Sequence, residues 1–142
     1  MAIWLDHITE HNMSPEQVAW HFKKPFKPQE IHQRKGPGGK MLSYINARDV
    51  MKRLDDVVGS HNWSDRYVME NERVTCELTV RYGDEWITKS DGAGETQIEG
   101  EKGIFSDAFK RAAVKHGIGR HLYYEKQITP EQYERLVPCP QD

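Results

Sequence analysis

The chain has 142 residues, of which 37% are hydrophobic and 30% charged, a composition that fits one globular domain with a core of ordinary size. No apolar run approaches the roughly 20 residues needed to span a bilayer, and the first residues show no signal-peptide pattern. We therefore expect a cytoplasmic protein with no membrane partner. Cys76 and Cys139 make no metal-binding pair, and we expect no metal and no cofactor.

The net charge is −2, but the charges are unevenly spread along the chain. Residues 20–40 carry six basic side chains and one acidic side chain, and residues 101–126 carry six basic and three acidic ones. Folding that joins these two basic blocks would give a near-neutral protein one positive surface, whereas separate blocks would be ordinary solvated surface. Taken alone, the charge pattern favours the solvated surface.

The first expected helix begins at Ser14 and Pro15, a cap residue followed by the residue best tolerated in a first turn, and it ends near Phe22. Residues 1–24 are therefore interpreted as an N-terminal helical segment.

Residues 25–43 contain three prolines and three glycines and are expected to form an irregular loop or arm. Its glycine-rich part resembles a phosphate-binding loop only in composition, because Gly39 and Lys40 are followed by Met41 where a Ser or Thr is needed. The sequence therefore gives no support to nucleotide hydrolysis, whereas a mobile basic loop that holds a DNA backbone remains open beside a plain surface linker.

Residues 46–58 repeat apolar side chains at helical spacing and predict an amphipathic helix. The period then changes to two over residues 74–82, which predicts a strand with one buried face. Strands over about 63–70 and 85–91, joined to it by short turns, would complete a three-stranded antiparallel sheet.

A second long helix is predicted from Glu99 or Ile104 to His116, with His116 in the core. Its expected core stripe comprises Phe105, Ala108, Phe109, Ala112 and Ala113. The predicted fold class is α+β, with a three-stranded antiparallel sheet packed on this long helix (a β-β-β-α core) and the amphipathic helix before the sheet. We assign the core domain to residues 25–126 and a short helix and tail to residues 127–142.

Three cations of this helix, Lys110, Arg111 and Lys115, gather on the side opposite its core stripe when successive residues are placed about 100° apart. Such a face can track the phosphates of a nucleic acid. Val114 lies within this face, where a base or a neighbouring subunit would explain it better than water. A solvated helix surface with one stray valine is the equally weighted alternative.

A family likeness is carried by residues 44–45, 62–63, 106–112 (Ser-Asp-Ala-Phe-Lys-Arg-Ala) and 117–120. This series resembles the single-strand annealing family of the Rad-fifty-two type and looks closer to its DdrA-like branch. The resemblance implies a β-β-β-α core, oligomeric rings, and single-stranded DNA held in a groove by basic residues. By position, Lys110 and Arg111 match the basic pair of the groove helix, and Arg34 matches a groove arginine. Val114 stands where the eukaryotic branch has a further arginine, which Lys115 could replace.

We therefore expect a non-enzymatic protein that coats or protects single-stranded DNA and anneals strands in recombinational repair without nucleotide hydrolysis. Double-stranded DNA is a second candidate ligand, and a homo-oligomeric ring is the expected assembly. The predicted DNA-binding residues are Arg34, Lys35, Lys40, Lys110, Arg111, Lys115 and Arg120. The alternatives are a metal-dependent nuclease that uses His61 with nearby carboxylates, and a protein-binding oligomeric scaffold.

Overall fold

A computed structural model describes residues 13–94 and 103–141. Its α-helices are α2 (Pro15–Lys23), α3 (Ala47–Val58), α4 (Ile104–Lys115) and α5 (Pro130–Leu136). Its strands are β1 (His32–Lys35), β2 (Met41–Tyr44), β3 (Trp63–Glu70), β4 (Arg73–Tyr82) and β5 (Glu85–Gly94). Short 3-10 turns are η1 (Pro28–Glu30), η2 (Pro37–Gly39), η3 (Ser60–Asn62) and η6 (Arg120–Tyr123). The α+β class is confirmed, whereas the expectations for residues 1–12 and 95–102 lie outside the described residues.

The main sheet is antiparallel in the order β3-β4-β5, so the predicted three-stranded sheet is confirmed. The central strand β4 alternates strictly between buried and partly exposed residues, as its period of two predicts. Strand β5 continues to Gly94, three residues beyond the predicted end at Asp91. Two glycines fit this extension against β4. A Cβ at Gly92 would approach Thr75 and the carbonyl of Val74 to 3.2 Å, and a Cβ at Gly94 would approach the side chain of Arg73 to 3.2 Å.

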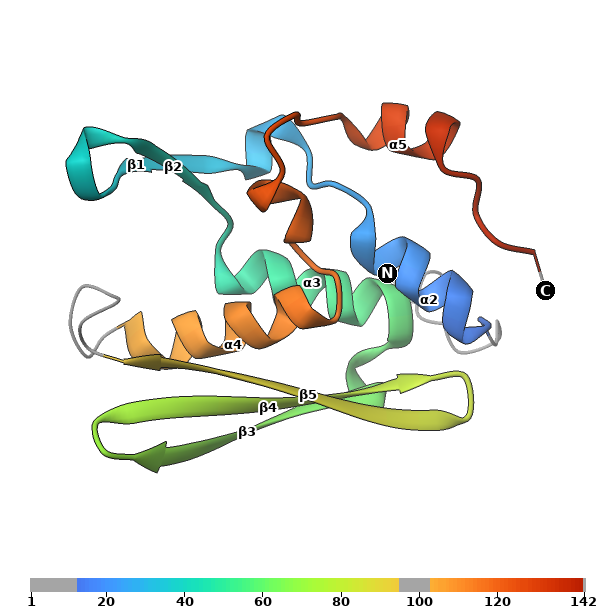
Figure 1. Ribbon diagram of the computed structural model, residues 1–142. Helices are drawn as coiled ribbons and strands as arrows, with labels where there is room; N and C mark the ends of the chain where they lie inside the picture. The colour runs from blue at the N-terminus through green and yellow to red at the C-terminus, as the bar shows by residue number, and fades with distance from the viewer. Residues whose placement is uncertain (1–12, 95–102, 142) are drawn as a thin grey trace.

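Helix α4 covers one face of this sheet, packing on β4 and β5 with α3 beside it (Figure 1). The buried residues on the helix are Ile104, Ala108, Phe109, Ala112 and Ala113. The prediction that Phe105 belongs to the core stripe is wrong, because its side chain is 43% exposed and contacts the ring of Tyr67 edge-on. Ile104 is buried instead, so the core stripe begins one residue earlier than predicted.

Helix α4 ends at a glycine, as the sequence predicts. Gly117 has φ of +106°, and the next amide, that of Ile118, donates to the carbonyl of Ala113 at 3.0 Å. This is the Schellman arrangement, which requires a left-handed residue after the helix. A Cβ on Gly117 would also approach the side chain of Lys23 to 3.0 Å, so the residue both ends α4 and makes room for the end of α2.

The irregular loop expected over residues 25–43 is wrong in its central part, because β1 and β2 form an antiparallel hairpin there. The glycines make its turn, where the amide of Gly36 donates to the carbonyl of Lys40 at 2.6 Å. The hairpin projects away from the helices (Figure 1), and every residue of both strands except Tyr44 is exposed. With no buried face, these strands lack the hydrophobic alternation from which a strand is predicted.

Arg53 of α3 joins α2 to the segment that leads into the hairpin. Its Nη1 atom donates to the carbonyls of His21, Phe22 and Lys24, which stabilises the C-terminal end of α2. The guanidinium carbon also lies 4.2 Å from the ring centroid of Phe26. One partly buried cation of α3 thus contacts both α2 and the segment that leads into the hairpin.

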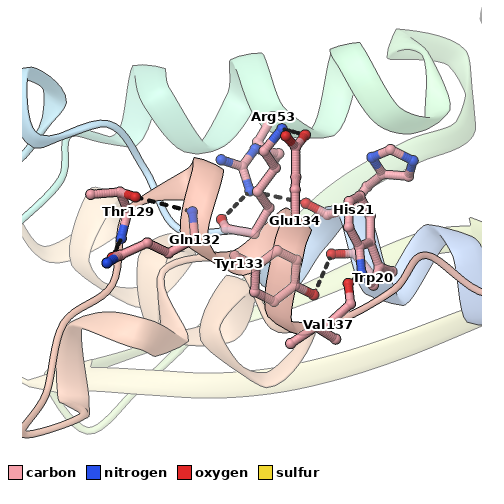
Figure 2. Close-up of polar contacts among 9 residues, drawn as sticks. Trp20, His21, Arg53, Thr129, Gln132, Tyr133, Glu134 and Val137 are labelled. Carbon is pink, nitrogen blue, oxygen red and sulfur yellow. Dashed lines mark hydrogen bonds and ion pairs between the residues drawn. The ribbon is translucent and has the colours of Figure 1, made fainter.

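Helix α5 and the residues after it pack on α2 (Figure 2). The hydroxyl of Tyr133 donates to the carbonyl of Trp20 at 2.9 Å, and the indole of Trp20 donates to the carbonyl of Val137 at 2.7 Å. Lys24 and Glu134 add an ion pair at the exposed edge. The C-terminal segment is therefore part of the folded body, while the predicted domain boundaries at residues 24 and 126 stay predictions.

Two buried histidines have hydrogen-bond partners on both ring nitrogens. Nε2 of His116 donates to the carbonyl of Leu78, and its Nδ1 shares a hydrogen bond of 2.6 Å with the hydroxyl of Tyr82. Nε2 of His121 accepts from the amide of Phe26 at 3.1 Å, which leaves Nδ1 to donate to Gln127. The prediction that His116 is a core residue is confirmed, at 4% exposure.

Within residues 13–94 and 103–141, no helix combines the length and the apolar character needed to cross a bilayer.

We expect the protein to lose stability in mild acid. Burial lowers the pKa of His21, His116 and His121 below the ordinary value of 6.5, so the unfolded chain takes up protons more readily than the folded one. The stabilisation is complete above about pH 6.5 and falls as the pH drops from there towards the lower pKa values of the folded state. Urea unfolding between pH 7.5 and 5 measures this loss. His116→Gln should reduce the slope by at most about 1.4 kcal/mol per pH unit, and an unchanged slope would contradict the assignment.

Tyr133→Phe should lower the free energy of unfolding by about 1–2 kcal/mol, because it removes a buried hydrogen bond and leaves the carbonyl of Trp20 without this donor. Chemical denaturation measures the difference. Leu136→Ala is the matched control on the same helix, since Leu136 is 69% exposed and its truncation should change stability by less than about 0.5 kcal/mol. Equal effects of the two substitutions would show that the Tyr133 contact does not stabilise the fold.

Candidate nucleic-acid interface

The foot of the hairpin places a tyrosine beside an arginine. Strand β2 ends at Tyr44, and the next residue, Ile45, is buried in the core. The guanidinium carbon of Arg34, on the partner strand β1, lies 5.9 Å from the ring centroid of Tyr44. This is within the range of a cation–π contact, so the ring helps to orient the arginine.

Lys110 reaches the same tyrosine from α4. Its Nζ atom lies 5.7 Å from the ring centroid of Tyr44 and donates to the carbonyl of Ile45 at 3.2 Å. Burial lowers the pKa of Lys110; the charge of Asp107 opposes this shift and that of Arg34 adds to it. Two cations from distant parts of the sequence thus meet at one ring, and we call Arg34, Tyr44 and Lys110 the Tyr44 cluster.

Arg111 and Lys115 point to a different place, the edge strand β5. The Nε atom of Arg111 lies 3.6 Å from Oδ1 of Asp91, and Nζ of Lys115 donates to the carbonyl of Ser90 at 2.5 Å. The two side chains are four residues apart on α4 and so share one side of it, whereas Lys110 is rotated by about 100° from Arg111. The expectation of one face with three gathered cations is therefore corrected: the cations divide between the hairpin foot and β5.

Arg120 lies beyond the end of α4 and bonds back to it. Its Nε donates to the carbonyl of Val114 at 3.1 Å and its Nη2 to the carbonyl of Lys115 at 2.9 Å. These are carbonyls of the last turn, which have no partner within the helix. Arg120 therefore caps α4, and its predicted contact with DNA stays a prediction.

Lys35 and Lys40 flank the turn of the hairpin, and both are exposed. Lys35 is the last residue of β1, and Lys40 immediately precedes β2. They continue the positive charge of Arg34 outward along the hairpin. We call the surface formed by Arg34, Lys35, Lys40, Tyr44 and Lys110 the hairpin–α4 surface.

Reasoning from the sequence missed two residues of this region. The sequence assigns Tyr44 no role beyond the family likeness of residues 44–45, yet its side chain is partly exposed between two cations. Asp91 was interpreted only as the end of a strand. A signal for Tyr44 was present in the sequence, because it is an aromatic residue at the border of the first basic block, but nothing in the sequence pairs Asp91 with Arg111.

His61, the residue named for a nuclease, lies exposed in the turn η3, where its ring contacts Asn62. Among the residues that the structure describes, no group of three or more histidine, cysteine, aspartate or glutamate side chains is arranged to hold a metal ion.

Comparison with known proteins shows a similar sequence in a DNA-binding protein. The chain is 37% identical over 89 residues to the single-stranded DNA-binding protein DdrA of Deinococcus radiodurans. The matched region is 58% of this chain and 40% of DdrA, so the chain corresponds to less than half of that protein.

A family comparison covers more of the chain. Residues 14–135 match the profile of the Rad52/22 family of double-strand break repair proteins. The match includes the β1–β2 hairpin, the three-stranded sheet and α4, and thus every residue of the hairpin–α4 surface. The sequence resemblance is confirmed, and the chain belongs to the Rad52/22 family of double-strand break repair proteins.

Proposed function

We propose that the protein binds single-stranded DNA through the hairpin–α4 surface together with Arg111, Lys115 and Arg120 of the adjoining region. Binding would promote the annealing of complementary strands in recombinational repair. The observation that carries the proposal is the Tyr44 cluster, in which Arg34 of the hairpin and Lys110 of α4 converge on one aromatic ring. A backbone that crosses this point would meet positive charge from both elements. The similarity to the single-stranded DNA-binding protein DdrA supports single-stranded DNA as the ligand.

The two lysines can bind phosphate without giving up their present partners. An ammonium group has three donors, and the carbonyls of Ile45 and Ser90 each take one from Lys110 and Lys115. The guanidinium of Arg111 has two terminal nitrogens beyond its Nε. The existing contacts therefore orient these side chains and reduce the entropy lost when they bind DNA.

Annealing follows from this mode of binding without a chemical step. Phosphates neutralised by lysine and arginine release counterions, so binding should weaken steeply as salt is raised. A strand held by its backbone leaves its base edges available for a complementary strand. The proposal includes no nucleotide hydrolysis. A cytoplasmic location, with nucleoid association if the host is bacterial, stays an expectation from the sequence.

The double variant Lys110→Ala, Arg111→Ala should weaken binding of a labelled oligonucleotide at least tenfold near 0.1 M salt, because it removes two phosphate contacts. Annealing should be lost with it, while the circular dichroism spectrum is kept. The matched control is Lys52→Ala with Arg66→Ala, which removes two exposed, ion-paired cations from α3 and β3. Unchanged annealing in the first variant would refute the assignment, and cleavage of the DNA in magnesium would favour the nuclease alternative.

We further propose that the chain assembles into a homo-oligomeric ring, as the family resemblance implies. Sedimentation or light scattering should give the mass of a closed assembly of many subunits. A strict monomer at micromolar concentration would contradict this part of the proposal. A large assembly that binds no DNA at low salt would instead favour a protein-binding scaffold.

A further inference from the structure

Asp91 is an acidic residue placed among the cations of the candidate interface. It lies on the edge strand β5, and its side chain is 28% exposed beside α4. The adjacent carbonyl, that of Ser90, accepts a hydrogen bond from Lys115. An anion at this position faces the same cations that DNA phosphates would need.

The pair that Asp91 makes with Arg111 is electrostatic and is not a hydrogen-bonded clamp. The distance of 3.6 Å between Oδ1 and Nε exceeds that of a hydrogen bond, and this buried Nε has no hydrogen-bond partner among the described residues. A clamp that fixes an arginine on a carboxylate normally uses two short, parallel hydrogen bonds. The main effect of Asp91 on Arg111 is therefore its charge.

Asp91 keeps its position without help from Arg111. Its Oδ1 accepts a hydrogen bond from the amide of Gly92 at 2.7 Å, so the strand itself holds the carboxylate. The position is thus occupied by negative charge whether or not the arginine turns towards it. An asparagine has the same shape and can accept the same hydrogen bond through its amide oxygen.

We propose that Asp91 competes with DNA phosphate for Arg111. This competition makes the affinity of α4 for the strand lower than its cations alone would give. Asp91 acts through Arg111 and is a positioning residue that does not itself bind DNA. Weaker binding lets a bound strand shift and dissociate while it searches for its complement. This inference rests on the proposed function, because it concerns a cation that the proposed function places on DNA.

Asp91→Asn tests the competition directly. The variant should bind a labelled single-stranded oligonucleotide about threefold to tenfold more tightly near 0.1 M salt, since Arg111 then meets phosphate without an opposing charge. The slope of log affinity against log salt should also steepen by up to about 0.7, the value for one phosphate fully neutralised on a single strand, because Asp91 no longer offsets part of the Arg111 charge. A purely structural role of Asp91 would not change this slope.

Two controls separate the competition from a general effect of net charge. Glu77→Gln removes one acidic charge from the opposite face of the same sheet, where Glu77 pairs with Arg66, and should leave affinity and slope close to those of the wild type. In an Arg111→Ala background, Asp91→Asn should no longer tighten binding. Equal tightening with Arg111 absent, or by Glu77→Gln, would overturn the inference.

Failure of the inference differs from failure of the proposed function. If the wild type binds single-stranded DNA and Asp91→Asn binds it no more tightly, only the competition is refuted. If neither protein binds DNA at low salt, the proposed function and the inference fall together.

Discussion

The close approach of α4 to the three-stranded sheet is the constraint on which the rest of the structure depends. Helix α4 packs on β4 and β5, and its Ala108, Ala112 and Ala113 are fully buried. At these positions the helix presents only a methyl group to its neighbours. Larger side chains would push the helix outward, because a packed core does not absorb extra volume without strain.

The position of α4 also determines which backbone groups its lysines can contact. Lys115 can touch the backbone of β5, and Lys110 the backbone that follows β2, because α4 lies so near to both. Their long apolar stems run along the protein surface while the charged ends keep donors for a ligand. The alanine face thus organises the core and the candidate interface at the same time.

The hairpin depends on a second set of contacts, because it has almost no core of its own. Its entry is held at Phe26, whose ring packs on Arg53 and stacks with His121, and its exit at the buried Ile45. Two anchors on either side bring an exposed pair of strands to a defined place beside α4. The Tyr44 cluster at its foot is one result of this anchoring.

The sequence alone determined the helices, the central sheet and the types of residue at the interface. The periods of α3 and β4 and the glycine at the end of α4 are local patterns set by burial of one face, and they are visible without coordinates. Only the tertiary structure decided the hairpin, the role of Tyr44 and the direction of each cation. An exposed hairpin has no alternation to detect, and a helical projection places the Cβ of Lys110 or Arg111 but not the end of a long side chain. That end is fixed by partners such as Ile45 and Asp91, which come from other parts of the chain.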